Sequence, residues 1–351
     1  MSAAVGTSSD LWSPVIDHIL RAQKIVLTTH ENSDGDGLGS QTALYHVLRQ
    51  LGKDVTIVNA TVIPKNYRFL IDLLDENNSD TALIYDDANA AHVEKLEQAD
   101  LAFVLDTNRI TRTKTIRPQL LRQQAAGKTK LICIDHHLEP EDFADICICL
   151  DYASATGELV YELIKHLEAR TEKSFIDSTT ATGLYTAIMT DTGSFKFPKT
   201  TAHVHHIIAE LIERGASPTD IFDKVFNTQT EGSLKLAGMS VEGIHLAEHG
   251  HIAYLSVSQQ MLRDTSTGLS DTEKLTDYLM SMPKTKIGMM FIELPDGSTK
   301  ASFRSRGDIF VNRLAQNYGG GGHKNAAGCV MPLALADAIP AALEKAKQLL
   351  N

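Results

Sequence analysis

The chain of 351 residues lacks the features that mark several large classes of protein. Its apolar residues never run for the roughly 20 positions that a membrane-spanning helix requires. The N-terminus has no basic segment followed by an apolar stretch, so we expect no secretory signal peptide. Internal repeats and low-complexity segments are also missing, which argues against a solenoid or a disordered protein. These absences predict a cytoplasmic globular protein with no membrane association.

Cysteine is scarce and carries no recognisable pattern. The four cysteines are Cys133, Cys147, Cys149 and Cys329. No two form a CxxC pair, and their spacing is not typical of a zinc site. Three lie in apolar, strand-like runs, and we interpret them as small buried hydrophobic residues. A reducing compartment is the simplest expectation from this usage.

Positively charged residues are fewer than negatively charged ones. Lysine and arginine total 33 against 44 aspartate and glutamate, so the formal net charge is −11. A protein that wraps long nucleic acid needs clustered cations for the phosphates, so a long duplex is excluded as a partner. A short nucleotide is still compatible with this charge, because bound metal and a few local cations can hold its phosphates.

The apolar residues predict two α/β domains. In the first half, strand-like runs alternate with helical patterns, at residues 24–29, 55–60, 101–106 and 131–135. Such an alternation is typical of a doubly wound, mostly parallel sheet with helices on both faces. Helical patterns then dominate residues 154–243, including 201–214 and 220–243. The last hundred residues predict strands at 251–257, 286–294 and 299–306, with a hairpin at Asp296-Gly297, and helices at 270–281, 308–317 and 333–350.

From this pattern we expect three segments. An α/β domain with the parallel sheet would cover residues 11–192, a helical connector 193–243, and a smaller α/β domain with a mixed sheet 244–351.

Aspartate and histidine follow the ends of the predicted elements in an unusual pattern. The residues are His30, Asp34 and Asp36, then Asp106, then Asp135, His136 and His137, and finally Asp191. The C-terminal ends of parallel strands meet at one edge, where ligands bind, so the first three groups should meet in space. Clustered carboxylates repel one another unless a cation is present. Oxygen and imidazole ligands without cysteine suit Mn²⁺ or Mg²⁺, and paired metals are typical of phosphoryl hydrolysis.

These residues also have structural interpretations. An aspartate between a strand and a helix is often only an N-cap, which applies to Asp34 and Asp106. The Asp135-His136-His137 sequence could be a polar turn.

A second signal lies near the C-terminus, in the sequence GGGGHKNAAG at residues 319–328. Successive glycines allow the backbone N–H groups to approach an anion closely, and His323 and Lys324 add side-chain donors. Arg304 and Arg306 flank Ser305 on the preceding predicted strand, and arginine binds phosphate in a bidentate manner. A flexible loop and a solvated charged strand are the alternatives.

Together these motifs resemble the DHH superfamily of phosphoesterases. The resemblance rests on HENSDGDGLGS at 30–40, Asp106, IDHH at 134–137, TDTGSF at 190–195 and GGGGHKNAAG, and it covers about residues 15 to 345. The last motif resembles the DHH-associated domain of the exonuclease and nucleotide-phosphatase branch. Ser33 and Asn108 depart from the family pattern without removing a ligand.

The resemblance implies that residues 11–192 are the catalytic, metal-binding domain and that residues 244–351 bind the substrate or nucleotide. It also implies a role for each motif residue. One Mn²⁺, with Mg²⁺ as the alternative, would be held by His30, Asp34 and Asp106. The second would be held by Asp36, Asp106, His136 and Asp191, so Asp106 would bridge the pair. His137 would face the substrate phosphate, and Asp135 would orient a histidine. Substrate would be bound by Arg304, Ser305, Gly320, Gly321, Gly322 and His323, in a cleft between the domains.

The implied activity is hydrolysis of short oligoribonucleotides to mononucleotides and removal of the 3′-phosphate of 3′-phosphoadenosine 5′-phosphate. A phosphodiesterase for cyclic or linear dinucleotides, an inorganic pyrophosphatase and a non-catalytic nucleotide sensor are the alternatives. Intact candidate ligands at every position argue against the sensor. Homodimerisation through the hydrophobic helices of the first domain is compatible with the sequence.

Overall fold

The computed structural model describes residues 8–74 and 81–350 of the chain, without the side chains of residues 8–10 and 323. It divides into two compact units, Met1–Thr228 and Gln229–Asn351. The segment 193–243, expected from the sequence as a helical connector, therefore has helices in both units. Each unit has its own sheet and its own hydrophobic core.

The first unit is built on a six-stranded parallel sheet in the order β3-β2-β1-β4-β5-β6. Its strands are β1 Lys24–Thr28, β2 Asp54–Asn59, β3 Ala82–Ile84, β4 Leu101–Leu105, β5 Lys130–Asp135 and β6 Ile146–Cys149. The doubly wound parallel sheet and its four main strands are as predicted. The short edge strand β3 was not predicted, because three partly exposed residues carry little hydrophobic signal. The apolar, strand-like run that contains Cys147 and Cys149 forms the other edge strand, β6.

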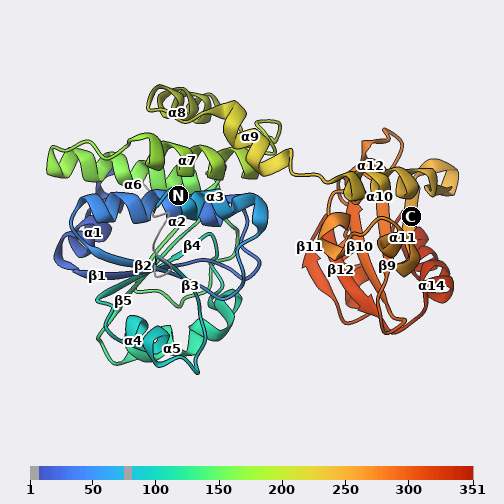
Figure 1. Cartoon of the computed structure of the whole chain (residues 1–351), viewed down its shortest axis with the longest axis horizontal. Helices are drawn as coiled ribbons and strands as arrows, with labels where there is room; N and C mark the ends of the chain where they lie inside the picture. Colours follow the sequence, from blue (N-terminus) through green and yellow to red (C-terminus); the bar gives the residue numbers. More distant parts are fainter. Residues whose placement is uncertain (1–7, 75–80, 351) are drawn as a thin grey trace, which may run out of the picture. The chain divides into compact units, whose positions relative to one another are not determined.

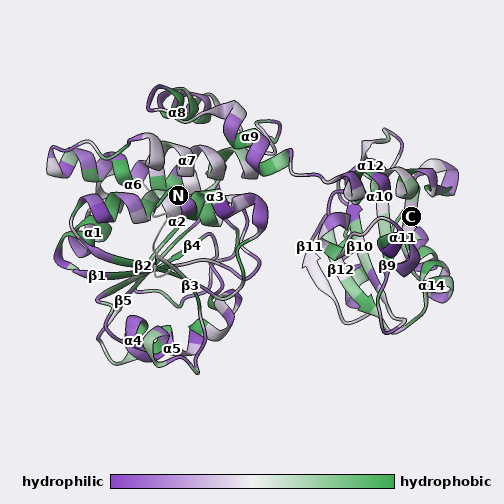
Figure 2. Ribbon diagram, viewed as in Figure 1, coloured by the Kyte–Doolittle hydropathy of each residue, from purple (hydrophilic) through white to green (hydrophobic). Residues whose placement is uncertain are grey.

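Helices cover both faces of this sheet, with α4 and α5 on one face and α2, α6 and α7 on the other (Figure 1). The helices are α1 Ser8–Arg21, α2 Gly35–Gln50, α3 Arg68–Asp72, α4 Ala90–Glu97, α5 Arg117–Ala125, α6 Thr156–Thr171, α7 Ser178–Asp191, α8 Ala202–Glu213 and α9 Pro218–Phe226. Figure 2 shows the central strands as hydrophobic and the outer helices as mixed in polarity. This distribution agrees with a sheet buried on both faces.

Glycines bring α2 and α7 into close contact. A Cβ atom at Gly39 would lie 2.4 Å from the carbonyl oxygen of Gly183, and one at Gly183 would lie 2.8 Å from that of Gly39. Real Cβ atoms cannot approach a backbone oxygen so closely, so the two helices cross here only because both positions lack a side chain. This crossing positions the C-terminal end of α7, where Asp191 lies.

The second unit contains a six-stranded mixed sheet in the order β11-β12-β10-β9-β8-β7. Only β8 and β9 pair in parallel. The strands are β7 His245–Ala247, β8 Ile252–Val257, β9 Ile287–Glu293, β10 Thr299–Ser305, β11 Gly321–His323 and β12 Ala326–Met331. The helices are α10 Glu231–Glu242, α11 Gln259–Asp264, α12 Leu275–Ser281, α13 Val311–Gln316 and α14 Leu335–Gln348.

The predicted hairpin at Asp296-Gly297 is confirmed, and it joins β9 to β10. The single helical stretch expected at 220–243 is wrong in one respect, because the chain leaves α9 at Asn227 and re-enters a helix at Glu231. Thr230 caps α10 by accepting a hydrogen bond from the N–H of Ser233 at 3.1 Å. Within the part of the chain that the structure describes, every helix is too short or too polar to span a bilayer.

Candidate metal centre

The structure brings the predicted aspartates and histidines together at the C-terminal edge of the parallel sheet. Ligand atoms of His30, Asp34 and Asp106 lie within 4.8 Å of one another. Nε2 of His30 is 3.3 Å from Oδ2 of Asp106 and 3.8 Å from Oδ1 of Asp34. Nδ1 of His30 lies 2.7 Å from the carbonyl oxygen of Glu31. This second contact orients the ring so that Nε2 points at the carboxylates.

A second group is formed by Asp36, His136 and Asp191, whose ligand atoms also lie within 4.8 Å of one another. Nε2 of His136 is 3.3 Å from Asp191, 3.7 Å from Asp36 and 3.7 Å from Oδ1 of Asp106. The two oxygens of Asp106 therefore face different histidines. This is the arrangement expected of a carboxylate shared between two cations.

The chemistry of the donors fits a pair of divalent cations. Nε2 of His136 is buried and makes no hydrogen bond, although three carboxylates surround it. A buried polar atom without a partner is costly, and metal coordination would remove the cost. The six side chains offer oxygen and imidazole ligands, which suit Mn²⁺ and Mg²⁺.

Electrostatics also favour bound cations. Burial, and then the charges of Asp106 and Asp191, raise the pKa of Asp36 well above its usual value. Burial and the charge of Asp34 raise the pKa of Asp106 well above its usual value and that of Asp191 to about 6. Divalent cations would stabilise the ionised forms. Burial lowers the pKa of His136 to about 4, so its imidazole is neutral, as a ligand must be.

Local backbone structure determines the positions of the Asp34 and Asp106 carboxylates. Asp34 is the N-cap of α2, and its Oδ1 accepts hydrogen bonds from the N–H groups of Asp36 and Gly37 at 3.1 and 3.4 Å. The capping interpretation of Asp34 is therefore correct, and the same residue also faces His30. Asp106 directly follows β4 with φ +59°, a left-handed conformation that costs energy at a non-glycine residue. Strain of this kind concentrates at functional sites.

Asp135 and His137 form a pair beside the two groups. Nδ1 of His137 lies 2.7 Å from Oδ1 of Asp135, which is completely buried. The side chain of Asn108 donates hydrogen bonds to the carbonyl oxygens of His137 and Leu138, at 2.9 and 3.0 Å. Asn108, which departs from the family pattern, thus fixes the backbone that carries His137.

Sequence reasoning missed two residues at the start of α6. The N–H groups of Thr156 and Gly157 donate to the carboxylate of Asp36 at 2.7 and 2.9 Å. The hydroxyl of Thr156 also donates to Oδ1 of Asp106 at 3.1 Å. The sequence predicted only that a helix starts near residues 154–155. A predicted helix start does not show which groups accept hydrogen bonds from the first N–H groups of the helix.

The glycine-rich segment contains the edge strand β11 and the start of β12, so the alternative of a flexible loop is wrong for most of it. Gly321 and Gly322 belong to β11 and pair with Gly328 and Ala327 of β12. A Cβ atom at Gly320 would lie 2.2 Å from the carbonyl oxygen of Gly328, so glycine is needed for this close approach. An edge strand leaves N–H groups outside the sheet ladder, so anion binding by the backbone stays compatible with the fold.

The other candidate residues of this unit differ in their contacts. The hydroxyl of Ser305 donates to the carbonyl oxygen of Ile309 at 2.7 Å, which ties down the turn after β10. Arg306 donates to the carbonyl oxygens of Met280 and Pro283. Arg304 is half-buried and donates through Nη1 to the carbonyl oxygen of Phe303 at 3.1 Å. The side chain of His323 lies outside the described part of the chain.

Lys324 interacts with side chains of its own unit. Its Nζ lies 2.6 Å from the carboxylate of Asp308 and 4.8 Å from the ring centre of Phe310.

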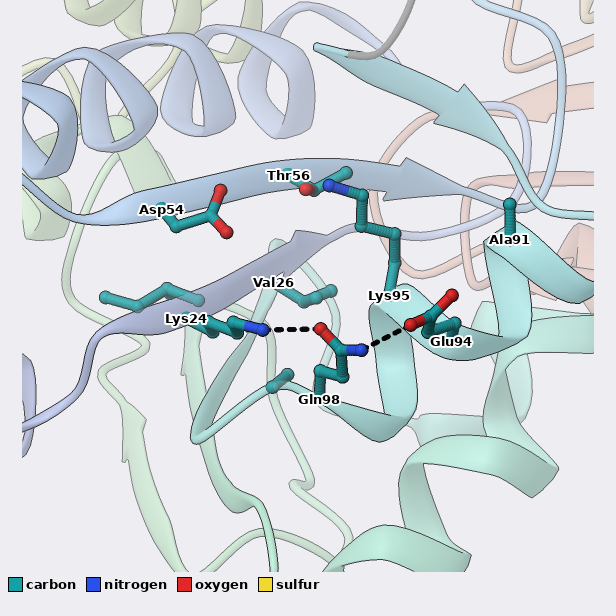
Figure 3. A pocket seen from close by; sticks show the side chains of 10 residues that line it. Lys24, Val26, Asp54, Thr56, Ala91, Glu94, Lys95 and Gln98 are labelled. Atoms are coloured by element: carbon teal, nitrogen blue, oxygen red, sulfur yellow. Dashed lines mark hydrogen bonds between the residues drawn. The ribbon is translucent and has the colours of Figure 1, made fainter.

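A pocket of about 230 Å³ lies on the first sheet away from the metal centre (Figure 3). Lys24 and Asp54, which begin β1 and β2, line it together with side chains of α4. The Lys24 ammonium donates to the side chain of Gln98, which in turn donates to Glu94. Ligands of open α/β sheets bind beyond the C-terminal ends of the strands, so this pocket is separate from the candidate site.

Relatives of known name align over most of the chain. The bifunctional oligoribonuclease and PAP phosphatase NrnA of Bacillus subtilis is 29% identical over 87% of this chain and 88% of its own length. The enzyme of the same name from Thermus thermophilus is 27% identical over 90% and 87%. The cyclic-di-AMP phosphodiesterase GdpP of Geobacillus thermodenitrificans is 26% identical over 88% of this chain, which spans only 45% of GdpP.

Solved structures and family domains agree with this result. An exopolyphosphatase-related protein from Bacteroides fragilis superposes over 100% of both chains with a TM-score of 0.88 and 29% identity. The exonuclease RecJ bound to manganese shares the fold, with a TM-score of 0.59 and 16% identity over 98% of this chain and 95% of RecJ. The N-terminal domain of the DHH family matches residues 24–188, and the DHHA1 domain matches residues 252–351. The chain therefore consists of a DHH-family N-terminal domain followed by a DHHA1 domain.

Proposed function

We propose that this protein is a two-metal phosphoesterase that degrades short oligoribonucleotides to mononucleotides and removes the 3′-phosphate of 3′-phosphoadenosine 5′-phosphate. One observation carries the proposal: Asp106 faces His30 with one carboxylate oxygen and His136 with the other, at 3.3 and 3.7 Å. A carboxylate shared in this way is typical of paired-metal hydrolases of phosphate esters. The names of the NrnA relatives supply the substrate class.

The metal ligands follow from the two groups of side chains. His30, Asp34 and Asp106 would hold one cation, and Asp36, Asp106, His136 and Asp191 would hold the other. Mn²⁺ is the proposed ion, with Mg²⁺ as the alternative. When bound, the pair would supply positive charge for the phosphoryl oxygens and lower the pKa of a coordinated water.

The remaining residues would orient the metal ligands or neutralise charge on the substrate phosphate. His137, held by Asp135, would stabilise charge on the substrate phosphate. Thr156 and Gly157 would hold Asp36 and Asp106 in place through hydrogen bonds, so that the carboxylates need not reorganise during the reaction. Arg304 and the backbone of Gly320, Gly321 and Gly322 would bind a nucleotide phosphate, with His323 as a further donor. Ser305 would support them by fixing the turn after β10.

A dinucleotide phosphodiesterase is the second candidate function, since the relative GdpP acts on cyclic-di-AMP by its name. The chain covers less than half of GdpP but nearly nine tenths of the NrnA enzymes. This difference in coverage favours the oligoribonuclease and phosphatase.

A substrate panel tests the proposal. Purified protein is incubated with RNAs of two to five bases, 3′-phosphoadenosine 5′-phosphate, cyclic-di-AMP and its linear dinucleotide, each with Mn²⁺, with Mg²⁺ or with chelator. We expect mononucleotides from the short RNAs and phosphate from 3′-phosphoadenosine 5′-phosphate, and no product with chelator. Preferential cleavage of cyclic-di-AMP would favour the second candidate, and inertness toward the whole panel would refute both.

Two substitutions provide the matched comparison. Asp106→Ala removes the shared carboxylate and should abolish hydrolysis while leaving the circular dichroism spectrum unchanged. Asp87→Ala removes an exposed carboxylate outside both ligand groups and should leave activity unchanged. Near-normal activity of Asp106→Ala would overturn the assignment of the site.

A further inference from the structure

We propose that Cys133, Cys147 and Cys149 form a second metal site, which binds a thiophilic cation such as Cu⁺, Zn²⁺ or Cd²⁺. The sequence spacing did not predict this site, because the three residues meet only through the pairing of two strands. Their sulfur atoms lie within 4.8 Å of one another. No residue of this cluster belongs to the aspartate and histidine groups of the candidate active site.

The register of β5 and β6 creates the cluster. Cys133 of β5 lies directly opposite Cys147 of β6, and Asp135 lies opposite Cys149. Residues two apart in a strand point to the same face, so Cys147 and Cys149 are side by side. Sγ of Cys149 is 3.0 Å from Sγ of Cys147 and 3.8 Å from Sγ of Cys133. Three sulfurs therefore converge at one point on the edge of the sheet.

The separation of Cys133 and Cys149 suits coordination of a single ion, whereas Cys147 would have to move away from Cys149 to bind the same ion. Thiolates at about 2.3 Å from a metal ion lie about 4 Å from one another. The distance between Cys133 and Cys149 already has this value, and Cys147 lies at the edge of the sheet, where small movements are tolerated. Three soft ligands select Cu⁺, Zn²⁺ or Cd²⁺ over Mn²⁺ and Mg²⁺, the opposite preference to that of the oxygen-rich centre.

Burial differs among the three thiols in a way that suits a binding site. Cys133 is completely buried, Cys149 is partly exposed and Cys147 is exposed. An ion could enter from the side of Cys147 and be held against the fixed Cys133. A disulfide would bond only two of the three neighbouring sulfurs, whereas one metal ion can coordinate all three. Cys329, in the other unit, takes part in no such group among the described residues.

Cadmium titration tests the proposal on the full chain. The protein is fully reduced, desalted without oxygen and saturated with Mg²⁺, so that the aspartate and histidine groups are occupied. Cd²⁺ is then added while the thiolate-to-cadmium charge-transfer band is recorded in the ultraviolet. We expect one Cd²⁺ per chain to generate the band. Cys147→Ser and Cys149→Ser should weaken Cd²⁺ binding at least tenfold, and Cys329→Ser should bind as the unchanged protein does.

The decisive variant is Cys147→Ser, because an exposed residue tolerates the change without loss of folding, which circular dichroism verifies. A Cys147→Ser protein that binds Cd²⁺ with unchanged affinity would overturn the proposal. Absence of the band in the reduced wild-type protein would do the same. A disulfide within the cluster that forms in air and that Cd²⁺ fails to prevent, seen as a loss of two hydrogens by mass spectrometry, would also count against a metal site.

Discussion

Oδ1 of Asp135 lies 2.7 Å from Nδ1 of His137, and Asp135 is completely buried at the end of β5. Burial alone would raise the pKa of Asp135, but the hydrogen bond and charge of His137 outweigh it and lower the pKa. Asp135 is therefore a carboxylate, and it holds the imidazole of His137 with a proton on Nδ1. The pair orients a ring that stands 4.5 Å from the ring of His136.

Replacing Asp135 by asparagine should slow the reaction without emptying the metal centre. The substitution keeps the size of the side chain but removes the charge that fixes the ring of His137. We expect kcat to fall about 10–100-fold, the usual cost of losing a supporting partner of this type. Metal content, measured by atomic emission, should stay unchanged. Loss of bound metal instead would make Asp135 a ligand and contradict the assignment.

Thr156→Val tests the hydroxyl that reaches Asp106. Valine matches the shape of threonine and keeps the N–H bond to Asp36, but it cannot donate to Oδ1 of Asp106. We expect kcat to fall roughly tenfold. Thr156→Ser retains the donor and should have near-normal activity. Equal activity of the valine and serine variants would show that the hydroxyl has no role.

Asp191→Asn should change stability in opposite directions with and without metal. Burial, and then the charge of Asp34, raise the pKa of Asp191 to about 6. A raised pKa means that the folded, metal-free protein holds a proton between about pH 4 and pH 6 that the unfolded chain has released, so its stability falls as pH rises through this window. Asparagine removes that penalty. The melting temperatures of both proteins are measured in chelator. We expect the difference, Asp191→Asn minus wild type, to increase between about pH 4 and pH 6 and to stay constant above pH 6.

Added Mn²⁺ or Mg²⁺ should reverse the sign of this difference. Ions that bind only the folded state raise its melting temperature, and the variant has lost one ligand. We expect Asp191→Asn to melt below the wild type at neutral pH with metal. A pH-independent difference in chelator would contradict the raised pKa, and the same difference with and without metal would contradict the ligand role.

Gly183→Ala tests the crossing of α2 and α7. The new Cβ atom would lie 2.8 Å from the carbonyl oxygen of Gly39 and 3.0 Å from the nitrogen of Ala43. We expect a loss of about 1–3 kcal/mol in the free energy of unfolding and weaker metal binding, because α7 carries Asp191. Gly238→Ala, inside α10, meets nothing within 4 Å and should stabilise the protein by roughly 0.5–1 kcal/mol. Urea denaturation of both variants gives the comparison.

The sequence by itself predicted the parallel sheet and most of the site. Strands β1, β4 and β5 are mostly apolar, and His30, Asp106 and Asp135 lie at or within two residues of their C-terminal ends. Parallel strands of one sheet all point the same way, so residues at their C-terminal ends must share an edge whatever the details of packing. For this reason His30, Asp106 and His136 could be grouped before any coordinates were known.

Only the tertiary structure decided the contacts that depend on how elements pack against one another. Asp191 ends a helix, and it reaches the site because glycines let α7 approach α2 closely. Thr156 and Gly157 contact Asp36 from about 120 residues away, and three cysteines converge through the register in which β6 pairs with β5. Local patterns determine periodicity and the ends of elements. The distance between two elements depends on side-chain volumes at their interface, which no single segment contains.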